Sequence, residues 1–347
     1  MANSGTEANE GALKLARKEQ IDKGLHFSNY FYSEPLKKAA QGLAKATGLD
    51  KVFMANSGTE ANEGALKLAR KYALMKGYTD RTEIVSMNKA FHGRSMGALS
   101  VTGTKKYREP FEPLISGVCF ADYNDLESVE QSISDKTYAV ILEAVQGEGG
   151  IYPAEGEFLK GVRELCHKHD IMMICDEIQC GMGRTGTMFA YEHYGIKPDI
   201  VTMAKGIGNG ITVGAIAATE EVAKALVPGD HGTTFGGNPL ACTAVVKSLE
   251  IFEEKKILEH VNTVGKYLEN KLSGLVDTYA VAKETRGLGL MRGLECDAPV
   301  GELCSKALEK GLILMSAGTN VIRFVPPLVV ETCHIDEMTG ILEQILS

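Results

Sequence analysis

The chain has 347 residues, of which 24% are charged and 44% hydrophobic, and its formal net charge is −8. This length predicts a large buried core and two domains. The acidic balance argues against a basic surface for nucleic acid or for an anionic membrane. No run of about 18 apolar residues occurs, so we expect no membrane-spanning helix. Eight cysteines without a Cys-x-x-Cys pair predict reduced thiols of a cytoplasmic protein and no metal site.

An identical repeat occupies the start of the chain. Residues 1–18, MANSGTEANEGALKLARK, recur without change at residues 54–71. Repeats of solenoid proteins drift in sequence and number at least three, so we interpret this pair as a duplicated segment. Only the second copy follows a predicted strand, Leu49–Phe53. We therefore expect residues 1–18 to be loose, and we interpret residues 19–45 as the remnant of an N-terminal region.

Apolar runs typical of buried strands alternate with helical patterns through the middle of the chain. The strand-like runs are Glu83–Ser86, Val118–Ala121, Ala139–Glu143, Ile171–Cys175, Ile200–Ala204 and Gly214–Ala218, with helical periodicity at Glu157–Lys168 and across residues 239–272. This alternation predicts an α/β fold with a mostly parallel sheet and helices on both faces. We predict a large domain over residues 46–250 and a smaller α+β domain over residues 251–347, which includes a strand at Val321–Val325.

Two charged residues end two of these predicted strands. Asp176 directly follows Ile171–Cys175, and Lys205 directly follows Ile200–Ala204. A carboxylate and an amine at neighbouring strand ends suit pyridoxal 5′-phosphate, which needs a lysine for its aldehyde and an acid to keep a proton on its ring nitrogen. A lone lysine before glycines is usually a solvated turn residue, but the matching position of Asp176 favours the cofactor.

A helix is predicted to open at Ser57, Gly58 and Thr59. Their backbone N–H groups would lie at the positive end of the helix dipole, where a phosphate binds. The same residues would also make an ordinary helix cap. The position alone therefore leaves both interpretations open.

Four further side chains are candidates for contact with a flat cofactor or a carboxylate substrate. Phe91 could stack on a ring and Arg94 could bind a carboxylate, although a core aromatic and a solvated arginine are the ordinary alternatives. Glu148 lies in a glycine-rich loop and could pair with an arginine. Arg323 is a charge within an apolar strand, so we expect a carboxylate partner. A glycosidase acid pair of Glu143 and Glu148 is disfavoured, because the chain has no Trp and no evident aromatic platform for a sugar.

Residues Gly181–Gly186 match the G-x-G-x-x-G pattern of dinucleotide-binding loops. Such a loop should begin at the strand end and open a long helix. Here Asp176–Gln179 intervene, and only a short helix, Met188–Tyr194, is predicted to follow. Asp199 falls near the spacing of a ribose-binding acid, but it begins the strand that leads to Lys205. We therefore do not expect a nicotinamide cofactor.

The motifs taken together resemble the class III pyridoxal-phosphate aminotransferases, most closely those that act on acetylornithine. The resemblance spans about residues 19–347 and is carried by Phe91–Ser100, Asp176–Gln179 and Thr233–Pro239. It implies fold type I, with a mostly parallel large domain, and a homodimer with shared active sites. Family members carry an N-terminal segment where this chain has the duplicate at residues 1–18.

The resemblance also implies roles for individual residues. Lys205 would hold the cofactor and then move a proton, Asp176 would bind the pyridine nitrogen, and Gln179 the ring hydroxyl. The implied cofactor site is Ser57, Gly58, Thr59, Phe91, Asp176, Glu177, Ile178, Gln179 and Lys205, completed by the partner subunit's Thr234. The implied substrate site is Arg94 and Thr233 for the amino donor, and Arg323, shielded by Glu148, for 2-oxoglutarate or glutamate.

The implied reaction is transamination between N2-acetylornithine and 2-oxoglutarate, which gives N-acetylglutamate 5-semialdehyde and glutamate. Ornithine, succinylornithine and 4-aminobutyrate remain alternative donors, because the resemblance does not separate them. A catalytically impaired pyridoxal-phosphate-binding protein is the alternative that the unusual N-terminus suggests.

Overall fold

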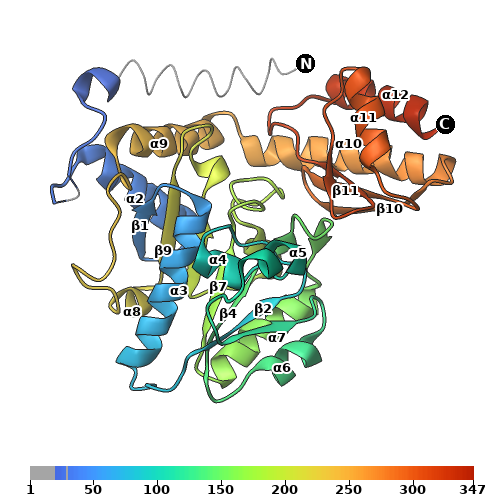
Figure 1. Cartoon of the computed structure of the whole chain (residues 1–347). Coiled ribbons are helices and arrows are strands. Elements are labelled where there is room, and N and C mark those ends of the chain that lie inside the picture. Colours follow the sequence, from blue (N-terminus) through green and yellow to red (C-terminus); the bar gives the residue numbers. More distant parts are fainter. Residues whose placement is uncertain (1–19, 29) are drawn as a thin grey trace.

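The computed structural model describes residues 20–28 and 30–347 (Figure 1). The loose segment predicted at residues 1–18 lies outside the described residues. Within the described part of the chain, no helix is both long enough and apolar enough to cross a membrane.

A seven-stranded sheet in the order β1-β9-β8-β7-β4-β2-β3 forms the larger part of the molecule (Figure 1). Its strands are β1 (Lys51–Ala55), β2 (Glu83–Met87), β3 (Val118–Ala121), β4 (Thr137–Leu142), β7 (Met172–Asp176), β8 (Ile200–Met203) and β9 (Gly214–Ala218). Strand β9 pairs antiparallel with both of its neighbours, β1 and β8, and all other pairs in the sheet are parallel. The predicted mostly parallel sheet is therefore confirmed, although the strand expected at Leu49–Phe53 forms two residues later, as β1.

Helices cover both faces of this sheet, because alternate strand residues point to opposite sides. Helix α3 (Gly58–Met75) contacts β8 and β9 on one face, where its alanines pack with residues such as Ile141 and Ile174. The neighbouring strand residues Val140 and Met173 belong to the core on the other face. The other helices of this part are α2 (Glu34–Thr47), α4 (Met96–Ser100), α5 (Lys105–Arg108), α6 (Leu126–Ser132), α7 (Gly156–Lys168), α8 (Glu220–Ala223) and α9 (Pro239–Glu254).

Short elements complete the connections around the sheet. They are the 3₁₀ helices η1 (Ile21–Lys23), η2 (Glu109–Phe111), η3 (Ala190–Tyr194) and η4 (Lys205–Ile207), and the paired strands β5 (Val145–Gln146) and β6 (Tyr152–Pro153). The short helix predicted at Met188–Tyr194 is thus a single 3₁₀ element, which begins two residues later.

A second sheet, in the order β10-β11-β13-β12, has its own hydrophobic core with three helices. The strands are β10 (Ala282–Leu288), β11 (Met291–Cys296), β12 (Met315–Ala317) and β13 (Val321–Phe324), and the helices are α10 (Ile257–Thr278), α11 (Gly301–Glu309) and α12 (Thr332–Leu346). Figure 1 shows this part beside the larger one, with α10 leading into it. We propose that residues 46–250 and 251–347 form two domains.

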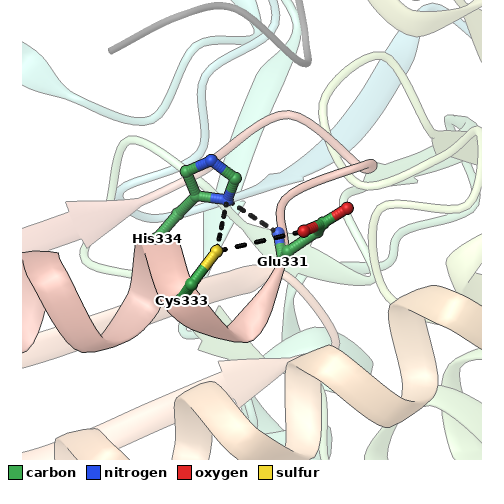
Figure 2. Close-up of side chains that lie close together, drawn as sticks. All are labelled: Glu331, Cys333 and His334. Atoms are coloured by element: carbon green, nitrogen blue, oxygen red, sulfur yellow. Dashed lines mark hydrogen bonds between the residues drawn. The ribbon is translucent and has the colours of Figure 1, made fainter.

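The first turn of α12 contains a thiol, an imidazole and a carboxylate close together (Figure 2). The Glu331 N–H donates to His334 Nδ1 at 3.2 Å, and Cys333 Sγ lies 3.7 Å from the same nitrogen. Their potential ligand atoms lie within 4.8 Å of one another. Because all three residues share one turn and already bond to one another, we interpret the group as a helix cap.

Candidate active site

A cavity of about 640 Å³ lies at the edge of the main sheet where β4, β7 and β8 end. Since β7 and β8 are parallel neighbours, Asp176 and Lys205 come to the same edge, and both line this cavity. Its other lining residues are Asn56, Ser57, Gly58, Thr59, Phe91, His92, Gly93, Arg94, Glu143, Ile178, Gln179, Ala204, Gly210, Ile211, Thr212 and Val213.

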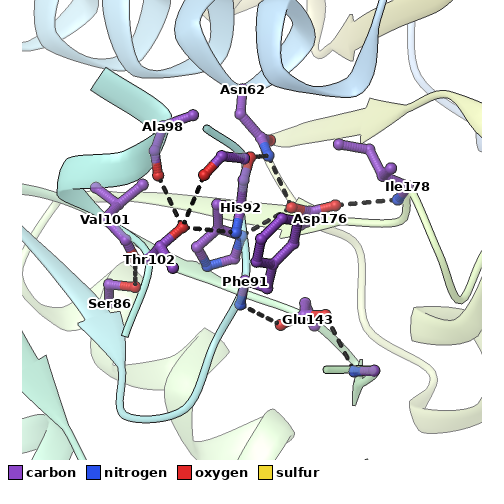
Figure 3. Close-up of polar contacts among 12 residues, drawn as sticks. Asn62, Ser86, Phe91, His92, Ala98, Val101, Thr102, Glu143, Asp176 and Ile178 are labelled. Atoms are coloured by element: carbon purple, nitrogen blue, oxygen red, sulfur yellow. Dashed lines mark hydrogen bonds and ion pairs between the residues drawn. The ribbon is translucent and has the colours of Figure 1, made fainter. Parts of the chain in front are cut away.

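The Asp176 carboxylate is buried and holds several hydrogen bonds (Figure 3). Its Oδ2 lies 2.7 Å from His92 Nδ1 and accepts from Asn62 Nδ2 at 2.8 Å. Its Oδ1 accepts from the Ile178 N–H at 3.0 Å. A carboxylate held at both oxygens keeps a fixed direction, so Asp176 is oriented before any ligand arrives.

Sequence reasoning missed two of these partners. His92 showed no partner along the chain, and Asn62 lies one turn inside α3 with nothing to distinguish it from a core polar residue. Burial by itself lowers the pKa of His92, but the hydrogen bond and negative charge of Asp176, together with Glu143, raise it above its ordinary value. His92 therefore holds the Asp176 carboxylate in place by a hydrogen bond at the wall of the cavity.

Glu143 is a further residue of this network, at the end of β4. Its Oε2 accepts from the Phe91 N–H at 3.1 Å, and its Oε1 accepts from the Gly147 N–H at 3.2 Å. Burial, above all, raises the pKa of Glu143 to about 7. Glu143 thus ties the segment of Phe91 to the loop that carries Glu148.

Lys205 lies in a strained backbone turn directly after β8. Its φ is +43°, in the left-handed region that residues other than glycine rarely adopt. The side chain is exposed at the cavity. Strain of this kind persists where the surrounding fold over-determines a position, and it clusters at functional sites.

The N-terminus of α3 forms another wall of the cavity. Ser57 Oγ accepts from the Glu60 N–H at 3.3 Å, so Ser57 does cap the helix. The Thr59 hydroxyl lies 2.7 Å from the Ser95 hydroxyl. An 18-residue helix presents its first N–H groups here, which favours an anion. This segment therefore caps the helix and also presents N–H groups that suit a phosphate.

Phe91 and Arg94 lie on the same wall. The Arg94 guanidinium is 4.2 Å from the centroid of Tyr107 and 5.6 Å from that of Phe91. Tyr107 meets Phe91 edge to face, with centroids 5.9 Å apart. Tyr107 therefore contacts both Phe91 and Arg94.

A second cavity of about 540 Å³ shares Ile178, Gln179 and Lys205 with the first. Arg323 from β13 lines it, and its Nη1 donates to Glu148 Oε1 at 2.5 Å and to Gln179 Oε1 at 3.4 Å. The carboxylate partner predicted for Arg323 is thus confirmed as Glu148. A residue of the second sheet thereby reaches the loop that follows β7.

Three predicted site residues line neither of these two cavities. Glu177 is not among the residues that line either cavity, because its carboxylate turns toward η3 and accepts from the N–H groups of Ala190 and Tyr191 at 2.8 and 3.0 Å. Its predicted place in the cofactor site is not supported, since neighbouring residues of the chain leaving a strand point in different directions. Thr233 and Thr234 also line neither cavity of this chain, although Thr233 Oγ1 accepts from Nδ2 of the cavity-lining Asn56 at 2.7 Å.

Comparisons with known proteins agree with this geometry. The family model described as "Aminotransferase class-III" matches residues 18–346. The acetylornithine aminotransferase of Clostridium acetobutylicum is 49% identical over 334 residues, which cover 96% of this chain and 86% of that protein. The crystal structure of the ornithine aminotransferase of Toxoplasma gondii superposes with a TM-score of 0.93 at 30% identity, covering 97% of this chain and 82% of that one. The N-acetylornithine aminotransferase of Stenotrophomonas maltophilia gives a TM-score of 0.84 at 36% identity, over 96% and 85%. This chain belongs to the class-III aminotransferases.

Proposed function

We propose that this chain transfers the δ-amino group of N2-acetylornithine to 2-oxoglutarate, giving N-acetylglutamate 5-semialdehyde and glutamate. The observation that carries the proposal is the meeting of Asp176 and Lys205 in one cavity, in a chain 49% identical to an acetylornithine aminotransferase. Ornithine is the second candidate donor, because an ornithine aminotransferase is among the similar folds, although at 30% identity.

The enzymes of this family use pyridoxal 5′-phosphate, which supplies an aldehyde carbon for the amino group and a ring that draws electrons from the reacting carbon. The cavity fits this group. Asp176 would keep a proton on the ring nitrogen, and His92 and Asn62 hold its carboxylate in place. Lys205 would hold the cofactor and, once released, carry a proton between the two reacting carbons.

The remaining walls suit the other parts of the cofactor. Gly58 and Thr59 would bind its phosphate at the positive end of α3, where Ser57 already caps the helix. Phe91 would stack on the ring, and Gln179 would bind its hydroxyl. The partner subunit's Thr234 would complete the phosphate site.

The substrate contacts follow from the two arginines. We assign Arg94, with Thr233 nearby, to the α-carboxylate of the amino donor. Arg323 would bind the carboxylate of 2-oxoglutarate or glutamate. Its bond with Glu148 then has a use: the carboxylate of Glu148 covers the arginine while the donor occupies the site, and it moves aside for the dicarboxylate.

We also propose that the chain forms a homodimer. The proposal is supported by large apolar side chains that lie exposed in the single chain. Phe31, Tyr30 and Tyr32 are 71, 93 and 102% exposed, and Phe235, beside Thr234, is 58% exposed. Apolar exposure on this scale marks interaction surfaces. Light scattering coupled to gel filtration tests the proposal, and a mass of one chain at micromolar concentration would contradict it.

The function is tested by loading the protein with pyridoxal 5′-phosphate and reducing it with borohydride. Peptide mass mapping should find the label on Lys205. In a parallel sample, the visible absorbance of the bound cofactor should bleach on adding N2-acetylornithine, and faster than with ornithine, succinylornithine or 4-aminobutyrate. A label on another residue would refute the assignment of Lys205. A cofactor band that no amine bleaches would identify a binding protein without activity.

A further inference from the structure

The loop Gly181–Gly186 is a motif that the reaction leaves without a role. It lies between β7, which ends at Asp176, and η3. We propose that this loop is the fixed joint between the two sheets, and that Arg184 within it is a positioning residue for Arg323. The inference rests on the proposed function, in which Arg323 binds the carboxylate of 2-oxoglutarate.

Arg184 holds two separate segments of the C-terminal part. Its backbone C=O accepts from the Leu290 N–H at 3.0 Å, and its side-chain Nη1 donates back to the Leu290 C=O at 3.1 Å. The same Nη1 donates to the Pro326 C=O at 2.5 Å. Leu290 lies in the turn between β10 and β11, and Pro326 follows the end of β13. One residue therefore binds both segments to the loop after β7.

The glycines of the joint allow its close contacts. A Cβ added at Gly289, in the β10–β11 turn, would lie 2.6 Å from the backbone carbon of Thr185 and 2.9 Å from the C=O oxygen of Arg184. A Cβ at Gly183 would lie 2.4 Å from the ring of Phe252, and one at Gly186 would lie 2.3 Å from Asn262 Oδ1. Steric contact with the C-terminal part explains why glycine occupies these positions. The G-x-G-x-x-G pattern therefore does not require a bound dinucleotide.

The joint acts on the site through β13. Arg323 stands on that strand, three residues before Pro326, and it shares the 540 Å³ cavity with Arg184. Its contacts with Glu148 and Gln179 both cross from the second sheet to the larger part of the molecule. A misplacement of about 1 Å at such a group can cost orders of magnitude in rate. Because Arg184 fixes Pro326 relative to the loop that carries Gln179, it also fixes the position of the Arg323 guanidinium in the cavity.

The hydrogen-bond partners of Arg184 support a positioning role rather than a role in an ion pair. Within the described residues, no carboxylate forms an ion pair with it, and burial alone lowers the pKa of Arg184 to about 10. Its bonds go to two backbone carbonyls instead. A methionine at this position would keep the apolar stem and remove both donors, while a lysine would keep the charge on a shorter side chain.

The test compares R184M with R81M, a matched control. Arg81 also donates to two backbone carbonyls, those of Asp170 and His169 at 2.6 and 3.1 Å, but it precedes β2 at the opposite edge of the sheet. In R184M we expect the KM for 2-oxoglutarate and the Kd for glutarate, a dicarboxylate that cannot be transaminated, to rise about tenfold or more. The rate at which N2-acetylornithine bleaches the cofactor should stay within about twofold, and R184K should be intermediate. R81M should change none of the three quantities.

Folded R184M with unchanged glutarate affinity, measured by calorimetry, would overturn the inference. An equal loss in both half-reactions would also overturn it, because that result indicates general damage. If R184M does not fold, Gly289→Ala takes its place, since its Cβ pushes the same contact apart, and the same selective loss is expected. A wild-type protein that neither bleaches with N2-acetylornithine nor makes glutamate would refute the proposed function, whatever R184M does.

Discussion

His92 Nδ1 lies 2.7 Å from Asp176 Oδ2, and both side chains are almost fully removed from solvent (Figure 3). Neither residue can therefore exchange its partner for water without moving the chain. The pair forms one unit with Asn62, which donates to the same oxygen. Changes to His92 are therefore expected to act through Asp176.

Asp176→Asn is expected to slow transamination about ten- to a hundredfold or more, since a charge-assisted hydrogen bond contributes roughly 1.5–3 kcal/mol. The turnover number of purified, cofactor-loaded protein measures this. Asp125→Asn is the control, because Asp125 caps α6 by accepting from the Ser128 N–H at 3.0 Å, on a helix outside the site. An unchanged turnover number in the Asp176 variant would contradict its assigned role.

His92→Leu removes the donor behind Asp176, and His92→Asn keeps a donor in a similar position. Because the pKa of His92 is raised in the folded chain, its stabilisation is complete below the unfolded pKa of about 6.5 and is lost as the pH rises through the folded value. The difference in free energy of unfolding between wild type and His92→Leu should therefore narrow as the pH rises from about 6 to about 9. Urea titrations at several pH values measure it, and a gap that widens instead would refute the pairing. His92→Asn should keep most of the activity.

Glu143→Gln replaces a buried acid, whose charged form is negative, whereas the charged form of His92 is positive. The pKa of Glu143 is raised by burial from 4.5 to about 7, so the folded chain binds more protons than the unfolded chain in this window. Its contribution therefore lowers the free energy of unfolding as the pH rises from 4.5 to 7. Across this range the free energy of unfolding of the wild type should fall further than that of Glu143→Gln, by about 1 kcal/mol or more. Parallel curves in urea unfolding would show that Glu143 does not titrate there.

Gly147→Ala should disturb Gln179. A Cβ at Gly147 would lie 2.0 Å from Gln179 Oε1, so the carboxamide must leave its place against Arg323. The Kd for pyridoxal 5′-phosphate, followed by its visible absorbance, should rise about tenfold, as expected for the loss of one hydrogen bond. Gly156→Ala is the matched control, because a Cβ there meets nothing within 4 Å. Equal affinity in both variants would argue against a cofactor contact by Gln179.

The amino-acid sequence determined the strands, their mostly parallel arrangement and the places of Asp176 and Lys205. It did so because buried parallel strands are continuous apolar runs, and the polar residue that ends each run must lie at the edge of the sheet. The sequence also predicted that the charge of Arg323 would have a carboxylate partner.

The tertiary structure alone decided what surrounds those residues. His92 and Asn62 are 84 and 114 residues from Asp176 along the chain, and no local pattern relates residues so far apart. The tertiary structure also turned Glu177 toward η3, away from the cavity, and it brought Arg184 into contact with Pro326, 142 residues later in the chain. Such pairs depend on how separate elements pack, and packing is a property of the whole folded chain rather than of any segment.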